Sequence, residues 1–180
     1  MKAQNIVLIG FMGCGKSSVA RELSTILNIC ALDLDAEIER AANQSVSQIF
    51  ARDGEEFFRI LETQTLREVL EKNAIIATGG GVPTVAQNRA LLQKSSALVV
   101  YLRTSPRTLA TRIRQQPGVR PLIDGGGKLS HRETLYVVED LLSRREKFYY
   151  QCATFSLDTD KLSPFQVATQ IASELTRKKV

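Results

Sequence analysis

The sequence predicts an α/β protein, a three-layer α/β/α sandwich in which helices cover both faces of a five-stranded parallel sheet. Five short apolar runs alternate with segments of helical periodicity, the pattern of a buried parallel sheet. The first run leads into Gly10–Ser17, which fits the phosphate-binding loop pattern G-x-x-x-x-G-K-S/T between a strand and a helix. Acidic or glycine-rich residues follow the second and third runs. Ligands of such folds bind at the carboxyl ends of the strands, so these three segments are expected to share one rim.

The expected strands are short apolar runs bounded by polar residues or glycine. They are Ile6–Ile9, Cys30–Leu34, Ala74–Ala77, Ala97–Leu102 and Ala153–Leu157. The second run ends in acidic residues, three glycines come soon after the third, and the fourth is the most apolar.

Helices are expected between the strands, where apolar residues recur with helical spacing. The first helix follows the loop and ends at about Leu27, and two short helices cover Asp35–Ala42 and Ser45–Arg52. The next helix runs from Gly54 to about Glu71, and another has Pro83 in its first turn. The last three helices run from Ser105 to about Arg114, from about Arg132 to Tyr149 and from about Pro164 to Thr176. Asn43 is expected in a left-handed conformation between the two short helices. Residues 114–128 contain two prolines and four glycines, so a flexible lid is expected there.

Length and composition describe an ordinary globular chain. The 180 residues are enough for one domain with a real core, and a single domain over residues 1–180 is expected. Hydrophobic residues make up 43% and charged residues 24%, which is typical of soluble proteins. The net charge of +5 is spread along the chain instead of clustering, which argues against a nucleic-acid-binding surface.

The cysteines and apolar runs bear on cellular location. Three widely spaced cysteines without a C-x-x-C pair favour neither a zinc site nor a disulfide framework, and they indicate a reducing compartment. The apolar run near the N-terminus is broken by Gly10 and no small-residue cleavage site follows, unlike a signal peptide. No stretch approaches the ~18 apolar residues of a membrane span. We expect a cytoplasmic monomer without membrane or nucleic-acid partners.

The phosphate-binding loop predicts a nucleotide site. Its glycines let backbone N–H groups converge on an oxyanion, and the start of the following helix adds positive potential. Lys16 can reach the terminal phosphates and Ser17 can bind Mg²⁺. Cys14 is interpreted as a residue that fills the loop and not as a nucleophile, although the nearby N–H groups and Lys16 could make it reactive. The alternative for the whole segment is a glycine-rich turn after a strand.

Asp33 and Asp35 follow the second apolar run. If the strand continued, the two carboxylates would share a face. Beside a magnesium nucleotide, one carboxylate can hold the metal's water shell while the other accepts a proton from an attacking hydroxyl. The alternative is that Asp35 only caps the helix that follows.

Two further segments point to a second ligand. Arg59 and Glu62 are spaced i, i+3 on a helix, so Glu62 can orient the guanidinium for an anionic ligand; a surface ion pair is the alternative. Gly79–Gly81 weakens any regular element, which favours close approach of a ligand to the backbone over a tight turn alone. Arg120 lies in the expected lid, where it could stabilise charge during phosphoryl transfer and help to exclude water.

Together these segments resemble the shikimate kinase family, within the nucleoside-monophosphate-kinase-like group of P-loop kinases. The motifs that carry the resemblance are, in order, the loop Gly10–Ser17, the D-x-D followed by I-E in Asp33–Glu39, Ser45–Phe50, the G-E-x-x-F-R-x-x-E signature Gly54–Glu62, Gly79–Gly81, the R-P-L lid motif Arg120–Leu122 and Asp158-Thr159. The chain has Asn43 where the family usually has glycine. It also lacks the proline of the family's usual R-x-P-L-Y, which here is Arg145–Tyr149.

The resemblance implies a role for each site residue. The nucleotide would be bound by Gly13, Cys14, Gly15, Lys16, Ser17, Ser18, Arg112 and Arg120, with Mg²⁺ at Ser17 and Asp33. Shikimate would contact Asp35, Arg59, Gly80, Gly81 and Arg145. Of these, Asp35 and Arg59 lie within the substrate-binding helices over residues 35–72, and Arg145 lies in the helix expected from about Arg132 to Tyr149. Lys16, Asp35 and Arg120 would be catalytic, with Asp35 as the base. Arg145 is chosen over Arg144 by its spacing from Tyr149, and Arg144 stays an alternative.

The function that the resemblance implies is transfer of the ATP γ-phosphate to the 3-hydroxyl of shikimate. A related P-loop kinase for gluconate or a nucleoside monophosphate is an alternative, which the intact signature at Gly54–Glu62 disfavours. A nucleotide-binding module without catalysis is a second alternative. It would not need the acid Asp35 or the lid arginine.

Overall fold

A parallel sheet of five strands forms the centre of the protein. The computed structural model describes residues 5–115 and 129–177. The strands are β1 (Ile6–Ile9), β2 (Ala31–Asp33), β3 (Ile75–Ala77), β4 (Leu98–Arg103) and β5 (Phe155–Asp158), in the order β2-β3-β1-β4-β5. All four pairings are parallel, and Ala77 of β3 is in register with both Leu8 of β1 and Asp33 of β2. The predicted five-stranded parallel sheet is confirmed.

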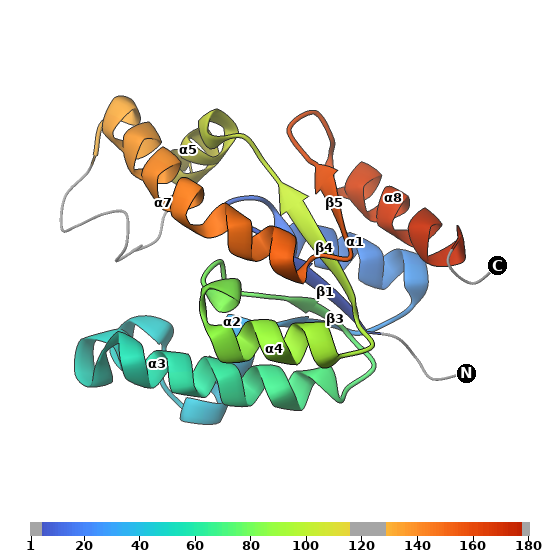
Figure 1. The fold of residues 1–180 in the computed structure, drawn as a ribbon, viewed down its shortest axis with the longest axis horizontal. Coiled ribbons are helices and arrows are strands. Elements are labelled where there is room, and N and C mark those ends of the chain that lie inside the picture. The colour runs from blue at the N-terminus through green and yellow to red at the C-terminus, as the bar shows by residue number, and fades with distance from the viewer. Residues whose placement is uncertain (1–4, 116–128, 178–180) are drawn as a thin grey trace.

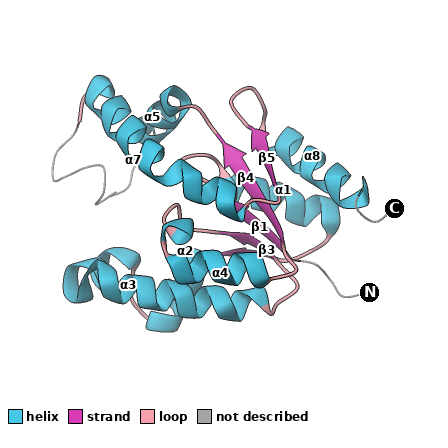
Figure 2. Ribbon diagram, in the orientation of Figure 1, coloured by secondary structure: helices cyan, strands magenta, loops and turns pink. Residues whose placement is uncertain are grey.

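Helices cover both faces of the sheet (Figures 1 and 2). The helices are α1 (Lys16–Leu27), α2 (Leu34–Ala42), α3 (Val46–Leu70), α4 (Ala86–Lys94), α5 (Pro106–Gln115), α7 (His131–Cys152) and α8 (Pro164–Arg177), with a short 3₁₀ helix at Val82–Thr84. Helices α1 and α8 pack together on one face, while α7 packs with α4 and α5 on the other. The three-layer α/β/α sandwich is therefore also confirmed.

The central strands carry the core. Every residue of β1 and β3 is buried, as are the first five residues of β4, because helices shield both faces of these strands. The residues of β5, at an edge of the sheet, alternate between partial burial and exposure. The continuous apolar runs that predicted the inner strands thus reflect burial on both faces.

The second strand is shorter than predicted and ends at Asp33. The Asp33 side chain accepts a hydrogen bond of 3.1 Å from the Asp35 backbone N–H, which starts α2 at Leu34. A carboxylate that accepts from the first helical turn favours helix over further strand. Asp33 is therefore the cap, so the alternative that Asp35 caps the helix is wrong. The two carboxylates also do not share the face of one continuing strand.

Other boundaries differ for local reasons. Helix α3 is interrupted at Gly54 (φ 83°, ψ 175°), so the two predicted helical segments meet there. Asn43 has the predicted left-handed conformation (φ 50°, ψ 36°). Pro83 was expected in the first turn of an α-helix but lies in the 3₁₀ helix, and α4 begins only at Ala86. Helix α7 starts one residue earlier than predicted, at His131 after a capping box between Ser130 and Glu133, and it continues three residues further, to Cys152.

The predicted lid falls largely on residues 116–128, including Arg120, which lie outside the described residues. Within the described ranges, no helix has the length and apolar character needed to cross a bilayer.

Candidate active site

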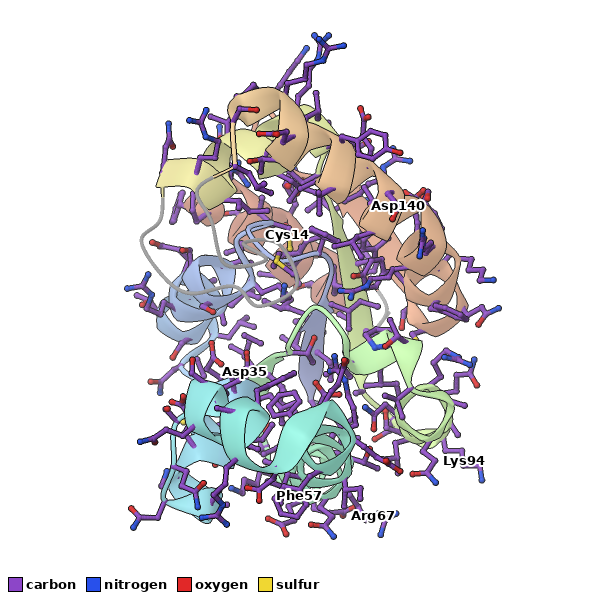
Figure 3. All side chains as sticks on the ribbon, turned by 90° about the vertical axis from the view of Figure 1, so that its left-hand side faces the viewer. Cys14, Asp35, Phe57, Arg67, Lys94 and Asp140 are labelled. Carbon is purple, nitrogen blue, oxygen red and sulfur yellow. The ribbon has the colours of Figure 1, made fainter. Side chains whose placement is uncertain are left out.

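The segments after β1, β2 and β3 meet at one edge of the sheet, as predicted. A Cβ atom on Gly79 would lie 3.1 Å from Asp35 Oδ1, which follows β2. A Cβ on Gly80 would lie 3.1 Å from the backbone nitrogen of Met12, in the loop after β1. Figure 3 looks onto this region, with Cys14 labelled on the loop after β1 and Asp35 labelled near the start of α2. Gly79 and Gly80 thus lie against two other strand ends, where a side chain would be crowded.

The side chain of Lys16 folds back over the phosphate-binding loop. Gly13 and Gly15 have positive φ angles of 81° and 98°, which only glycine adopts without strain. The Lys16 Nζ donates to the carbonyls of Gly10 (2.9 Å) and Phe11 (3.0 Å). The ammonium is thereby held over the loop, where it can exchange these carbonyls for phosphate oxygens. Gly13, Gly15, Lys16, Ser17 and Ser18 surround the start of α1, where backbone N–H groups have no acceptor within the helix.

Cys14 packs inside the loop. Its Sγ is buried, lies 3.6 Å from Lys16 Nζ, and would be 2.9 Å from a Cβ on Gly10. Its backbone N–H donates to Phe11 within the loop turn (3.2 Å). The Arg112 Nη1 lies 3.5 Å from the Cys14 carbonyl oxygen, so α5 brings one predicted nucleotide-binding arginine to the loop.

The side-chain oxygens of Ser17 and Asp33 lie next to each other. The Ser17 hydroxyl donates to Asp33 Oδ2 at 2.7 Å, joining the start of α1 to the end of β2. A hydroxyl and a carboxylate are the hard oxygen donors that Mg²⁺ prefers when phosphates and waters complete its shell. These two residues therefore fit the metal site that the sequence predicts.

Asp35 lies partly buried beside this pair. Burial raises the pKa of its carboxyl above the ordinary value, and the negative charge of Asp33 adds to the shift, while Lys16 and Arg59 oppose it. Asp35 Oδ1 is buried and has no hydrogen-bond partner among the described residues. A bound ligand, an ion or a water can satisfy such an oxygen.

Arg59 reaches the same rim from α3. Its guanidinium pairs with Glu62 Oε1 and Glu55 Oε1, each at 2.9 Å. The Glu62 side chain is only 1% exposed, so this is not the surface ion pair that was the sequence-based alternative. A Cβ on Gly81 would lie 2.5 Å from Arg59 Nη1, so the guanidinium rests directly against the third glycine.

Helix α7 contributes a second arginine and a tyrosine. The Arg145 guanidinium lies 5.8 Å from the centre of the Phe11 ring. It is also close enough to the Tyr149 hydroxyl to oppose the rise in the pKa of that group that burial causes. The Tyr149 hydroxyl donates to the Gly80 carbonyl at 2.7 Å. Arg144 instead pairs with Asp140 on the outer side of α7 and is 72% exposed. Of the two adjacent arginines, the structure places Arg145 at the rim.

The family model for shikimate kinase matches residues 12–176. The chain belongs to the shikimate kinase family. It is 42% identical over 172 residues to a shikimate kinase of Limosilactobacillus fermentum, covering 95% of each chain. It is also 42% identical to a Flavobacterium johnsoniae shikimate kinase, over 87% of this chain and 90% of that one. A solved Acinetobacter baumannii shikimate kinase in complex with shikimate aligns with a TM-score of 0.87 and 32% identity, covering 99% of this chain and 96% of that one.

Membership of the shikimate kinase family identifies the chain as an enzyme, a small-molecule kinase that takes a nucleotide as phosphate donor. The alternatives of a gluconate or nucleoside-monophosphate kinase and of a non-catalytic module are not favoured by these relatives. The fold is that of the solved P-loop enzymes of this family.

Two buried residues of this shikimate kinase site carry no signal in the sequence. In the sequence, Tyr149 only helps to align Arg145 with the family motif, yet in the structure it links α7 to Gly80. Asn88 lies between Gln87 and Arg89 on α4, where nothing distinguishes it from a solvated polar residue. Its contact with Glu62 spans 26 residues of sequence, so only the fold brings the two together.

Proposed function

We propose that this site transfers the γ-phosphate of Mg²⁺-ATP to the 3-hydroxyl of shikimate. The observation that carries the proposal is the position of the triple glycine. Its first residue lies against Asp35, its second against the phosphate-binding loop and its third against Arg59. A candidate base (Asp35), the phosphate-binding loop and a cation that can bind a carboxylate (Arg59) thus surround one stretch of backbone without side chains.

Arg59 and Arg145 are proposed to bind the shikimate carboxylate. Arg59 comes from α3, where Glu62 orients it, and Arg145 comes from α7, where it lies over the Phe11 ring and beside Tyr149. A guanidinium presents two parallel N–H groups to a carboxylate, which fixes the orientation of the ring as well as its affinity. Gly80 and Gly81 let the ring approach the backbone.

The donor half is proposed to lie over the phosphate-binding loop. Gly13 to Ser18 cradle the phosphates, with Arg112 beside the loop and Lys16 turning from the loop carbonyls to the β- and γ-phosphates. Ser17 and Asp33 would hold Mg²⁺, which neutralises phosphate charge when bound. Arg120, outside the described residues, would add positive charge to the transferring phosphate.

Asp35 is proposed as the base. Its carboxylate accepts the proton of the 3-hydroxyl as that oxygen bonds to the γ-phosphorus, and the bond from phosphorus to the β–γ bridging oxygen breaks to release ADP. The raised pKa of Asp35 makes it a better proton acceptor than an exposed aspartate. Positioning the hydroxyl in line with the phosphorus supplies much of the rate.

A coupled assay of ADP release tests the proposal. We expect ADP release to require Mg²⁺ and shikimate, and to be absent with gluconate or a nucleoside monophosphate. Asp35→Asn is expected to lose most of its turnover while it keeps nucleotide affinity. ADP release that ignores shikimate, or wild-type turnover in Asp35→Asn, would contradict the proposal. A monomeric state, cytoplasmic residence and the absence of nucleic-acid or membrane partners stay predictions.

A further inference from the structure

Asn88 is a buried amide that donates a hydrogen bond to one carboxylate, that of Glu62. It lies on α4 with no exposed surface, and its Nδ2 donates to Glu62 Oε2 at 3.2 Å. Its own carbonyl oxygen, Oδ1, is buried without a hydrogen-bond partner among the described residues. An unpaired buried carbonyl costs stability, so an apolar side chain of the same shape would suit the fold better. The presence of an amide therefore points to its contact with Glu62.

Glu62 in turn connects Asn88 to the substrate arginine. One carboxylate oxygen accepts from Asn88, and the other accepts from Arg59 Nη1 at 2.9 Å. The second partner of Arg59 is Glu55, whose side chain is 52% exposed. Exposed ion pairs hold a side chain weakly, so the buried Glu62 is the group that sets the direction of the guanidinium.

Neighbouring groups shift the pKa of Glu62 in opposite directions. Burial raises the pKa of its carboxyl to about 7, and the negative charge of Asp35 on α2 adds to this effect. Arg59 on the same helix and the amide of Asn88 on α4 oppose the shift, because both donate hydrogen bonds to the carboxylate. A proton on Glu62 would weaken its hold on Arg59 and leave the guanidinium to the exposed Glu55.

We propose that Asn88 is a positioning residue for the acceptor: it keeps Glu62 in place as a carboxylate, and Glu62 keeps Arg59 aimed at the carboxylate of the substrate. The inference rests on the proposed role of Arg59 in binding shikimate. It adds a specificity element on α4 that touches neither substrate.

Asn88→Leu tests the proposal, because leucine matches the shape of asparagine without its hydrogen bond. At about pH 7 we expect KM for shikimate to rise about tenfold and KM for ATP to change less than about twofold. The loss should shrink towards about pH 9, where Glu62 regains its charge without the amide. Gln87→Leu, an exposed neighbour on the same helix, is the matched control and should behave as wild type.

A purely structural role gives a different result. Thermal unfolding should show Asn88→Leu folded, and Asn88→Ala provides a second variant with the same expected pH dependence. In a Glu62→Gln background the leucine substitution should add little, since the partner is already neutral. The proposal is overturned if both KM values change together, or if the defect is independent of pH, or if the two substitutions are additive.

Arg59→Ala, measured alongside, separates this inference from the proposed function. If Arg59→Ala raises KM for shikimate but Asn88→Leu does not, only the inference about Asn88 fails. If Arg59→Ala leaves KM for shikimate unchanged, the proposed carboxylate site itself is wrong.

Discussion

The hydroxyl of Tyr149 donates a 2.7 Å hydrogen bond to the carbonyl of Gly80 and so ties α7 to the turn after β3. The Arg145 guanidinium, one turn earlier on α7, lies close enough to this side chain to oppose the rise in its pKa that burial causes. Its ring stacks on Tyr101 of β4 with 5.0 Å between the ring centres. One buried phenol therefore positions two of the groups that are proposed to bind the acceptor.

Tyr149→Phe is expected to weaken shikimate binding with little effect on ATP. The phenylalanine keeps the stacked ring but leaves the Gly80 carbonyl unpaired and removes the hydroxyl beside Arg145, so KM for shikimate should rise severalfold to about tenfold and unfolding free energy should fall by about 1 kcal/mol. Steady-state kinetics and urea unfolding measure both. Tyr150→Phe is the control, because the Tyr150 hydroxyl accepts only an exposed bond from Arg103. Equal losses in the two variants would argue against the positioning role.

Gly81→Ala is expected to damage the acceptor half alone. The added methyl would lie 2.5 Å from Arg59 Nη1, the far end of a flexible side chain, so the fold should survive while the guanidinium moves. Gly80→Ala meets the Met12 backbone nitrogen at 3.1 Å and should also affect nucleotide binding. Separate titrations with shikimate and with ATP distinguish the two patterns. If Gly81→Ala lowers both affinities equally, the division between the two halves is wrong.

The strands and the rim could be predicted because their signals are local. The inner strands are buried on both faces and therefore read as continuous apolar runs, and parallel strands bring their carboxyl ends to one edge. The end of β2 was missed because Asp33 acts both as the last strand residue and as the cap of α2. Asn88 and Tyr149 gave no pattern at all, since their partners Glu62 and Gly80 are distant in sequence.

The stability of the protein should fall as the pH rises through the range in which Glu62 ionises. Burial raises its pKa from 4.5 to about 7, so between these values the folded state binds more protons than the unfolded chain. Stability from this group is complete below about pH 4.5 and is lost as the pH rises to about 7, a change of about 3 kcal/mol. Glu62→Gln lacks this titration. Urea unfolding at about pH 5 and about pH 8 should therefore show the wild type losing more stability than the variant; parallel losses would contradict the shift.

Two substitutions at Asp33 are expected to separate its role as a helix cap from its proposed role in binding the metal. Asparagine caps helices about as well as aspartate, so Asp33→Asn should unfold close to the wild-type temperature, whereas Asp33→Ala should lose about 1 kcal/mol. Both variants lose the carboxylate beside Ser17, and we expect about tenfold more Mg²⁺ for half-maximal activity. Thermal unfolding and Mg²⁺ titration of the rate give the two readouts. A normal Mg²⁺ requirement in Asp33→Asn would remove Asp33 from the metal site.

Substitutions of the two adjacent arginines of α7 should differ sharply in their effect on shikimate binding. Arg145 lies over the Phe11 ring and beside Tyr149, whereas Arg144 makes an exposed pair with Asp140 that contributes about 0.5 kcal/mol or less. Arg145→Ala should therefore raise KM for shikimate by tenfold or more, since it removes a charge-assisted hydrogen bond worth about 1.5–3 kcal/mol, while Arg144→Ala should match the wild type. A substrate analogue without the carboxylate sharpens the comparison, because its affinity should not respond to Arg145→Ala. The opposite ranking of the two variants would show that α7 presents Arg144 to the acceptor when the substrate is bound.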